Sequence, residues 1–247
     1  MNNNLKNTLV IIPARGGSKR IVEKNIKIIH GYPMILWPLH TLNNLFNSEK
    51  ILVSTDSNKI KSVVESKGLK VPFRRPKSLS DDYTEVVEVT RHALKWYEEN
   101  IAKVKFVLTV YPTAVMLSEI DICKAMEMLE KNKKCDSIMS ATNFTFPIQR
   151  AVYENNDGFA EMFYPNKYST RSQDLVEAKH DAGQFYLSRV EAVRNGKKLT
   201  NSKVKLYPLN RNTVIDIDTP EDFEIAEEKL KFYKKKINPK WIITNDA

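Results

Sequence analysis

The sequence predicts an α/β protein, in which a mostly parallel sheet carries helices on both faces. Short apolar, β-branched runs alternate with longer amphipathic segments along most of the 247 residues. This alternation is typical of strands and helices that build a parallel sheet. The composition fits a packed core, since 42% of the residues are hydrophobic. We expect one domain over 1–247, interrupted by a single insertion.

The first half of the chain is expected to hold three strands and three helices. Each expected strand is short and rich in Val, Ile and Leu, and each helix repeats apolar residues at a spacing of three or four. Gly68 ends the second helix, and Pro112 closes the third strand. In order, the elements are strand 9–12, helix 32–46, strand 50–56, helix 58–68, helix 84–100 and strand 105–113.

The second half continues this pattern after one break. From Asn143 to about residue 180 the chain is rich in aromatic residues, Pro, Arg and Asn, without a long periodic element. An insertion of this kind is typical of a lid or a dimerisation arm, and we assign it to about 143–180. Thr219 and Pro220 suit the N-cap and first turn of a closing helix. The regular elements are helix 118–132, strand 136–142, strand 183–189, strand 213–218 and helix 219–235.

The formal net charge is +9 at pH 7. Such a balance suits nucleic acid, an anionic membrane surface or a phosphorylated substrate. The lysine-rich stretch 229–240 is interpreted as the solvated end of the last helix, where positive charge complements the helix dipole. It therefore argues for none of these partners by itself.

Cys123 and Cys135 are the only cysteines and belong to no C-x-x-C motif. Both are expected to be reduced thiols. The polar start of the chain does not fit a signal peptide, and no apolar stretch approaches the ~18 residues that span a membrane. We therefore expect a cytoplasmic protein without a membrane partner.

A glycine-rich, basic turn follows the first strand. Gly16 and Gly17 stand where the backbone is expected to turn sharply, and Arg15, Lys19, Arg20 and Lys24 surround them. Free backbone amides beside arginine and lysine can wrap a phosphate chain. A solvated, cationic turn is the alternative interpretation.

Two carboxylates near the end of the chain form a candidate metal site. Asp216 and Asp218 lie two apart on the expected last strand, so both side chains would point to one face. Mg²⁺ is commonly held by such a pair together with phosphate oxygens and water. The alternative is that one aspartate accepts backbone hydrogen bonds at the start of the last helix. Because ligands of α/β sheets bind at the carboxyl ends of strands, the pair and the glycine loop are expected to converge.

Other polar groups follow strands or lie in the insertion. Asp56 ends a strand and could contact a metal or a ribose. Arg74 and Arg75 precede Pro76 and present planar donors for a carbonyl or a carboxylate. Zinc spacing, a Ser-His-Asp arrangement and a P-loop motif are absent from the sequence. A further set suits a polar ligand that carries a carboxylate: Arg171, Gln173, Asp174, His180, Asp181 and Gln184.

These segments together resemble one family, the cytidylyltransferases that activate nine-carbon α-keto acid sugars, such as the CMP-sialic acid synthetases. The segments that match, in the family's order, are IIPARGGSKRIVEKN (11–25), VSTDS (53–57), RRP (74–76), YPTA (111–114) and DIDTPEDF (216–223). Within the family, the pseudaminic acid branch is the more similar one. That likeness rests on FPIQRA (146–151), MFYPN (162–166), RSQDL (171–175) and HDAGQFY (180–186).

The resemblance implies a Rossmann-like nucleotidyltransferase fold and a reaction. The anomeric hydroxyl of the sugar acid would attack the α-phosphorus of CTP, and pyrophosphate would leave. Arg15, Lys24, Asp216 and Asp218 would be catalytic, with Mg²⁺ on the two aspartates. Nucleotide contacts would come from Ala14, Arg15, Gly16, Gly17, Ser18, Lys24, Asn25 and Arg75, and sugar contacts from Tyr111, Arg171, Gln173, His180 and Gln184.

The resemblance also implies a homodimer, in which the insertion reaches the site of the other subunit. The product would feed a glycosyltransferase that modifies flagellin or a cell-surface glycan. Val22 and Val115 stand where the family usually has proline, so both loops are expected to be less pre-organised.

Two alternatives remain at this point. The same reaction could use N-acetylneuraminic or legionaminic acid. A non-catalytic nucleotide- or nucleic-acid-binding protein would use the basic loop alone, but the sequence shows no RNA-binding signature.

Overall fold

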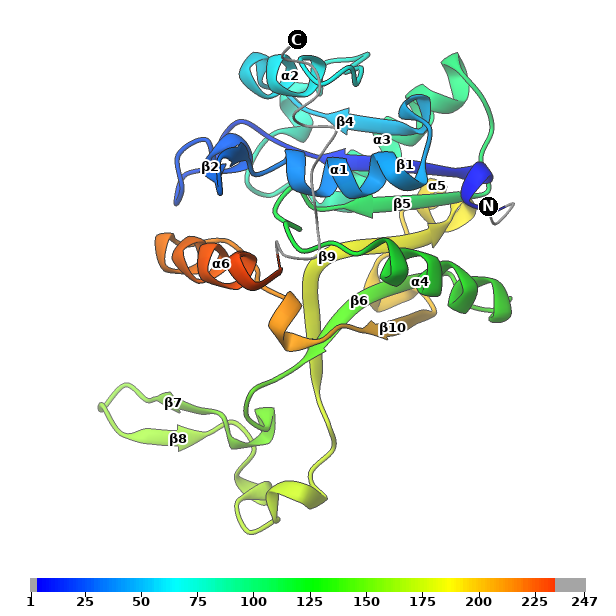
Figure 1. The fold of residues 1–247 in the computed structure, drawn as a ribbon. Coiled ribbons are helices and arrows are strands. Elements are labelled where there is room, and N and C mark those ends of the chain that lie inside the picture. Colours follow the sequence, from blue (N-terminus) through cyan, green and yellow to red (C-terminus); the bar gives the residue numbers. More distant parts are fainter. Residues whose placement is uncertain (1–3, 234–247) are drawn as a thin grey trace.

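The computed structural model describes residues 4–233, and its centre is a six-stranded sheet (Figure 1). The strand order is β10-β6-β9-β5-β1-β4. The last residues of the expected closing helix, 234 and 235, lie outside the described part. The strands are β1 (Thr8–Pro13), β4 (Ile51–Ser54), β5 (Phe106–Val110), β6 (Ser137–Asn143), β9 (Lys179–Arg189) and β10 (Val204–Pro208).

The sheet is mostly parallel, as predicted, with one reversed strand. β1 pairs in parallel with β4 and β5, and β10 pairs in parallel with β6. β9 lies antiparallel between β5 and β6. The insertion explains the reversal, because the chain leaves the sheet at the end of β6 and returns to the same edge along β9 (Figure 1).

Helices cover both faces of the sheet, which confirms the predicted architecture. Alternate residues of β1 face opposite ways, so Val10 and Ile12 pack in one apolar cluster while Leu9 and Ile11 pack in another. The first cluster includes residues of α1, α2 and α4, and the second includes residues of α3 and α5. The helices are α1 (Leu36–Leu45), α2 (Asn58–Glu65), α3 (Val86–Asn100), α4 (Glu119–Lys131), α5 (Val190–Arg194) and α6 (Pro220–Tyr233).

The helix expected over 32–46 begins later than predicted, at Leu36. Tyr32–Pro33 forms the short strand β3, which pairs with β2 (Ile28–Ile29). The backbone amides of Met34 and Ile35 donate to carbonyl groups of the preceding loop. Those bonds keep the segment extended until the first turn of α1.

The strand expected over 213–218 is wrong. Val214 and Ile217 of this segment are buried, but the backbone makes no ladder. The edge position beside β6 belongs instead to β10, which sequence reasoning missed. β10 is largely exposed and carries Lys205, so it lacks the apolar run that marks a buried strand. Asp216 and Asp218 therefore lie on an irregular segment between β10 and α6.

A large bulge in β9 is the main irregularity of the sheet. Tyr186 pairs with Met139, whereas Asp181 pairs with Ala141. One residue of β6, Ser140, therefore lies opposite four residues of β9, 182–185. The Ser140 hydroxyl accepts a hydrogen bond from the Phe185 amide at 3.0 Å and fills the gap in the ladder. The bulge moves the backbone of β9 toward the segment that carries Asp216.

The insertion forms an arm that projects away from the sheet (Figure 1). It contains a small hairpin of β7 (Val152–Glu154) and β8 (Ala160–Met162). We use the word arm for residues 144–178, between the ends of β6 and β9. Several of its large apolar side chains are exposed: Phe146, Val152, Phe159, Phe163, Tyr168 and Val176.

The structure also bears on the cysteines and on the length of apolar helices. Cys123 lies on α4, Cys135 lies just before β6, and both are free thiols. Within residues 4–233, none of the helices combines the length and the apolar character that a bilayer crossing requires.

Candidate active site

A cleft of about 590 Å³ opens at the carboxyl ends of β1 and β5. Both of the convergent groups predicted from sequence line it, namely the basic loop after β1 and the aspartate pair 216 and 218. The remaining walls come from the segment before α3 and from the turn after β5. The lining residues on which the argument depends are Arg15, Ser18, Lys24, Asn25, Arg75, Asp82, Tyr111, Asp216 and Asp218.

The glycine pair acts differently from the prediction. Neither Gly16 nor Gly17 has a positive φ, so a sharp left-handed turn is not the reason for glycine here. A Cβ on Gly16 would lie 2.9 Å from Cβ of Ser57, which is closer than packing allows. The Gly16 amide also donates to Asp56 at 2.8 Å. Gly16 therefore lets the loop pack closely against the start of α2.

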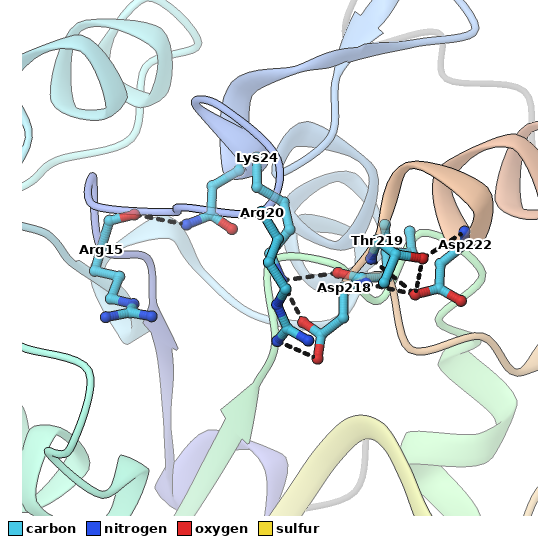
Figure 2. Close-up of polar contacts among 8 residues, drawn as sticks. Arg15, Arg20, Lys24, Asp218, Thr219 and Asp222 are labelled. Carbon is cyan, nitrogen blue, oxygen red and sulfur yellow. Dashed lines mark hydrogen bonds and ion pairs between the residues drawn. The ribbon is translucent and has the colours of Figure 1, made fainter.

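Carboxylates pair with the basic side chains of the loop. Arg15 donates to Oδ1 of Asp82 at 2.5 Å and to the carbonyl of Asp81 at 2.9 Å. Lys19 pairs with the other oxygen of Asp82. The side-chain amide of Asn25 donates to the Arg15 carbonyl at 2.9 Å, a bond that joins the two ends of the loop (Figure 2). Two cations thus face the cleft from one side, with Asp82 as a shared counter-ion.

Asp218 is the meeting point of the loop and the end of the chain. Lys24 Nζ donates to Oδ1 of Asp218 at 2.9 Å, and Arg20 donates to Oδ2 at 2.7 Å (Figure 2). Lys24 also donates to the Ile217 carbonyl at 2.7 Å. Burial alone would raise the pKa of Asp218, but the bonds and charges of Lys24 and Arg20 bring it below its ordinary value.

Asp216 has the opposite environment. Burial, followed by the negative charge of Asp218, raises the pKa of this carboxyl group. Gly183, in the bulge of β9, comes so close that a Cβ there would lie 3.3 Å from Oδ1 of Asp216. Gly183 also has φ +60°, which favours glycine. A side chain at residue 183 would therefore crowd Asp216, in a backbone conformation that also favours glycine.

A third carboxylate, Asp222, accepts the backbone hydrogen bonds that the alternative interpretation assigned to one aspartate of the pair. Oδ2 of Asp222 accepts the amides of Asp218 at 3.1 Å and Thr219 at 2.8 Å (Figure 2). Thr219 in turn accepts the Asp222 amide at 3.2 Å, which confirms it as the N-cap of α6. Asp222 thus supplies the bonds at the helix start, and Asp216 and Asp218 remain directed to the cleft.

The aspartate pair fits a Mg²⁺ ion in its chemistry. Two oxygen donors two residues apart face a cleft, and the raised pKa of Asp216 marks negative charge that a cation would relieve. Within residues 4–233, no three metal-binding side chains gather at one point. The other ligands of a Mg²⁺ ion here would therefore come from substrate and water.

Arg75 is the buried member of the arginine pair. Its guanidinium donates through Nε to the Ser54 hydroxyl at 3.1 Å and through Nη2 to the Ser54 carbonyl. Burial lowers the pKa of Arg75 to about 10, against the opposing charge of Asp56. Arg74 lies at the surface and donates to the Asp56 carbonyl at 2.9 Å. Arg75 thus presents a fixed planar donor to the cleft, while Arg74 only supports the turn.

The expected sugar residues divide into two groups. Tyr111 lines the cleft. Gln184 is buried beside it, since its backbone carbonyl accepts the Tyr111 amide at 2.9 Å and its side chain donates to the Thr213 carbonyl at 2.6 Å. Arg171 and Gln173 lie on the arm, away from the cleft of the same chain (Figure 1). The structure does not bring them to Tyr111 within one chain.

His180 belongs to the second of these groups. It lies at the foot of the arm, where it is exposed and packs edge-on against Phe144 at a centroid distance of 4.8 Å. It does not line the cleft.

The two valines in place of proline behave differently from each other. The Val115 amide donates to the Thr113 carbonyl at 2.8 Å, a bond that proline cannot make. Val115 is also buried in an apolar cluster. This loop is therefore held without proline, whereas Val22 is 79% exposed and packs in no apolar cluster of the described residues.

Sequence reasoning missed Asp82 and Tyr186 as site residues, and it named Arg20 and Asp181 without finding their partners. Arg20 and Asp82 are charged, but their partners become visible only when the loops meet. Asp181 and Tyr186 flank the bulge of β9, and the Tyr186 hydroxyl donates to Oδ2 of Asp181. The motif HDAGQFY contains both residues, but no local pattern shows that they hydrogen-bond to each other.

The sheet topology and this cleft define a nucleotidyltransferase of the α/β class. A sequence model of the family described as Cytidylyltransferase matches residues 9–237. The chain belongs to the cytidylyltransferase family. This confirms the family resemblance and the enzyme class predicted from the sequence.

Relatives within the family agree with this assignment. The chain is 37% identical to a pseudaminic acid cytidylyltransferase of Campylobacter jejuni over 89% of its own length and 94% of that protein. It is 28% identical to an N-acylneuraminate cytidylyltransferase of Streptococcus agalactiae, over 87% of its length and 51% of that protein. A CMP:2-keto-3-deoxy-manno-octonic acid synthetase complexed with CTP has a similar fold, with a TM-score of 0.68 at 14% identity, over 92% of this chain and 99% of the other.

The packing of Gly16 leads to a stability prediction. Gly16→Ala should lower the free energy of unfolding by about 1–3 kcal/mol, because the new methyl group overpacks against Ser57. Gly17→Ala is the matched control, since a Cβ at residue 17 meets nothing within 4 Å. Urea unfolding of both variants measures the difference. Equal stabilities of the two variants would contradict the packing argument.

Proposed function

We propose that this enzyme transfers CMP from CTP to pseudaminic acid, giving CMP-pseudaminic acid and pyrophosphate. The observation that carries the proposal is the 37% identity, over nearly the whole of both chains, to a pseudaminic acid cytidylyltransferase. The cleft supports it, since a basic loop and two carboxylates line one space that suits a nucleoside triphosphate. The same transfer to N-acetylneuraminic or legionaminic acid is the alternative.

The triphosphate would lie along the loop after β1. Arg15 and Lys24 would bind its oxygens, and the Gly17 amide would contribute to the same surface. The Gly16 amide is bonded to Asp56 and the Ser18 amide to the Gly16 carbonyl, so these two residues would shape the loop instead. In the structure both cations are paired, Arg15 with Asp82 and Lys24 with Asp218. Phosphate oxygens would replace these carboxylates as partners. The two side chains would then offset the charge that builds up on pyrophosphate as it leaves.

The base would lie beside Arg75. The described contacts of this guanidinium engage Nε and Nη2, and Nη1 remains for the cytosine carbonyl. Since Ser54 fixes the plane of the group, the donor direction is set before the nucleotide binds. Asn25 and the backbone at Ala14 would complete the nucleotide contacts.

Asp216 and Asp218 would hold Mg²⁺. When bound, the ion supplies Lewis-acid stabilisation of the phosphate charge. The residues of the chain prepare this site, because Asp222 occupies the backbone donors of the α6 start and Gly183 packs against Asp216.

The sugar would occupy a second cavity, of about 200 Å³, next to the cleft. Tyr111 lines both spaces and therefore marks their junction. The cavity carries the hydroxyl groups of Thr90, Thr109, Ser137 and Ser188. A polyhydroxylated acid placed here would present its anomeric hydroxyl toward the α-phosphate.

The arm would complete the site of a second copy of the chain. Its apolar side chains remain largely exposed in the single chain, and the arm, which carries Arg171 and Gln173, projects away from the sheet (Figure 1). In a homodimer the apolar groups would be buried, and Arg171, Gln173 and His180 would approach the sugar carboxylate of the partner site.

The substrate assignment is tested by pyrophosphate release from CTP and Mg²⁺. Pseudaminic acid and N-acetylneuraminic acid are supplied in parallel reactions. Release with pseudaminic acid alone is the expected result. Release only with N-acetylneuraminic acid would overturn the choice of sugar but keep the reaction. No release with either acid, nor with legionaminic acid in a third reaction, would reject both.

The metal assignment predicts that Asp218→Asn lowers turnover by about 100-fold or more, since several kcal/mol of transition-state stabilisation would be lost. Far-UV circular dichroism should show an intact fold. Asp157→Asn, on the exposed turn of the arm hairpin, is the control and should keep wild-type turnover. Wild-type rates in Asp218→Asn would exclude the proposed role.

The dimer proposal predicts that serine at Phe146 and Val176 yields a monomer. Both side chains are about four-fifths exposed in the single chain. Sedimentation velocity compares the double variant with the wild type. Ile120→Ser removes an exposed apolar side chain from α4 and should leave the dimer unchanged. A monomeric wild-type protein, or an unaltered double variant, would contradict the proposal.

A further inference from the structure

Tyr186 differs from four other hydroxyl groups around the second cavity in the partner it holds, while a fifth, on Ser202, donates to the Lys198 carbonyl. Thr90 and Thr109 pair with each other at 3.3 Å, and the Ser137 hydroxyl donates to Ser188 at 2.8 Å. A hydroxyl paired with another hydroxyl can exchange donor and acceptor roles. Tyr186 instead donates to a carboxylate, Oδ2 of Asp181. Its single proton is therefore committed to one acceptor.

Asp181 is itself fixed in place. Its other oxygen, Oδ1, accepts the Gly183 amide at 2.9 Å, inside the bulge of β9. The carboxylate thus bridges the two sides of the bulge, the amide of Gly183 and the ring of Tyr186. Burial, together with the bond and charge of Asp181, raises the pKa of Tyr186, so the phenol keeps its proton at neutral pH.

Tyr186 lines the second cavity. Its ring lies 6.3 Å from that of Tyr111, centroid to centroid, and Tyr111 marks the junction of the cavity with the cleft. A phenol oxygen whose proton is directed away offers only lone pairs to the cavity. It can accept a hydrogen bond from a ligand, but it has no proton to donate to one.

We propose that Tyr186 is a specificity-determining residue that accepts a hydrogen bond from an O–H or N–H group on a non-reacting part of the sugar acid, and that Asp181 is the positioning residue that fixes this polarity. The inference rests on the proposed function, since it concerns the second substrate of the same site. A ligand group that can only accept, such as an ether oxygen or a carboxylate, would face lone pairs and would be rejected.

The test measures the KM of each substrate separately in Tyr186→Phe. The KM for pseudaminic acid should rise by about tenfold or more, because the donor of the acid loses its partner in a buried place. The KM for CTP should change by less than about twofold, since Tyr186 does not line the nucleotide cleft. The control is Tyr207→Phe, which removes another tyrosine–aspartate bond, to Asp121 at 2.8 Å, away from both cavities.

Variants at Asp181 distinguish the direction of the Tyr186 hydroxyl proton from the packing of the Tyr186 ring. Asp181→Ala should raise the KM for the sugar, because the Tyr186 proton becomes free to point into the cavity. Asp181→Asn should recover part of the loss, since its amide oxygen can still accept from Tyr186. Analogues of the acid in which one O–H or N–H at a time is replaced by an acceptor-only group identify the donor. The analogue that lacks the true donor should bind the wild-type enzyme more weakly than pseudaminic acid does. Its binding should weaken no further when Tyr186→Phe is introduced.

The outcomes distinguish this inference from the proposed function. A sugar KM in Tyr186→Phe equal to that of Tyr207→Phe, in an active enzyme, overturns the role of Tyr186 and leaves the reaction untouched. The role of Tyr186 would also be overturned if, for every analogue, the loss of binding and the loss caused by Tyr186→Phe simply added. If N-acetylneuraminic acid is the substrate instead, the same comparison with that acid decides the inference. An enzyme inactive with pseudaminic, N-acetylneuraminic and legionaminic acids overturns the function and the inference together.

Discussion

The carboxylate of Asp218 joins the two ends of the described chain. Its bonds to Lys24 and Arg20 connect residues nearly 200 positions apart in sequence, and they close the cleft between the first loop and the last segment. Because Lys24 also holds the Ile217 carbonyl, the segment is fixed by backbone and side chain together. Ile21 and Ile217 also share an apolar cluster, so the bonds of Asp218 add a polar contact between segments that already pack together.

The bulge of β9 adapts a regular sheet to this arrangement. An uninterrupted ladder would keep β9 against β6 along its whole length, whereas the bulge carries Gly183 to Asp216 and Gln184 to the Thr213 carbonyl. The same four residues separate Asp181 from Tyr186 and let their side chains meet. One local irregularity therefore supports the carboxylate pair on one side and shapes the second cavity on the other.

The buried framework could be predicted from sequence because its signals are local. The apolar runs of β1, β4, β5 and β6 and the periodic faces of the helices identified most elements, and the motifs identified the loop and the aspartates. β10 could not be found, since an exposed edge strand with alternating lysines has no apolar run. The reason for glycine at position 16 could not be predicted either, because it is the close packing of the loop against Ser57. Partners such as Asp82 for Arg15 exist only after distant loops have met.

The arm leaves and re-enters the body at one pair of antiparallel residues, and Arg211 also donates to the Thr145 hydroxyl at its base. Asn143, the last residue of β6, lies opposite Lys179, the first residue of β9. The two ends of the inserted chain are thus neighbours in a ladder that is complete without it. An insert with this attachment can be lengthened, shortened or exchanged for another without altering the path of any core strand. The arm is therefore a module that evolution or protein engineering can change while the cleft stays intact.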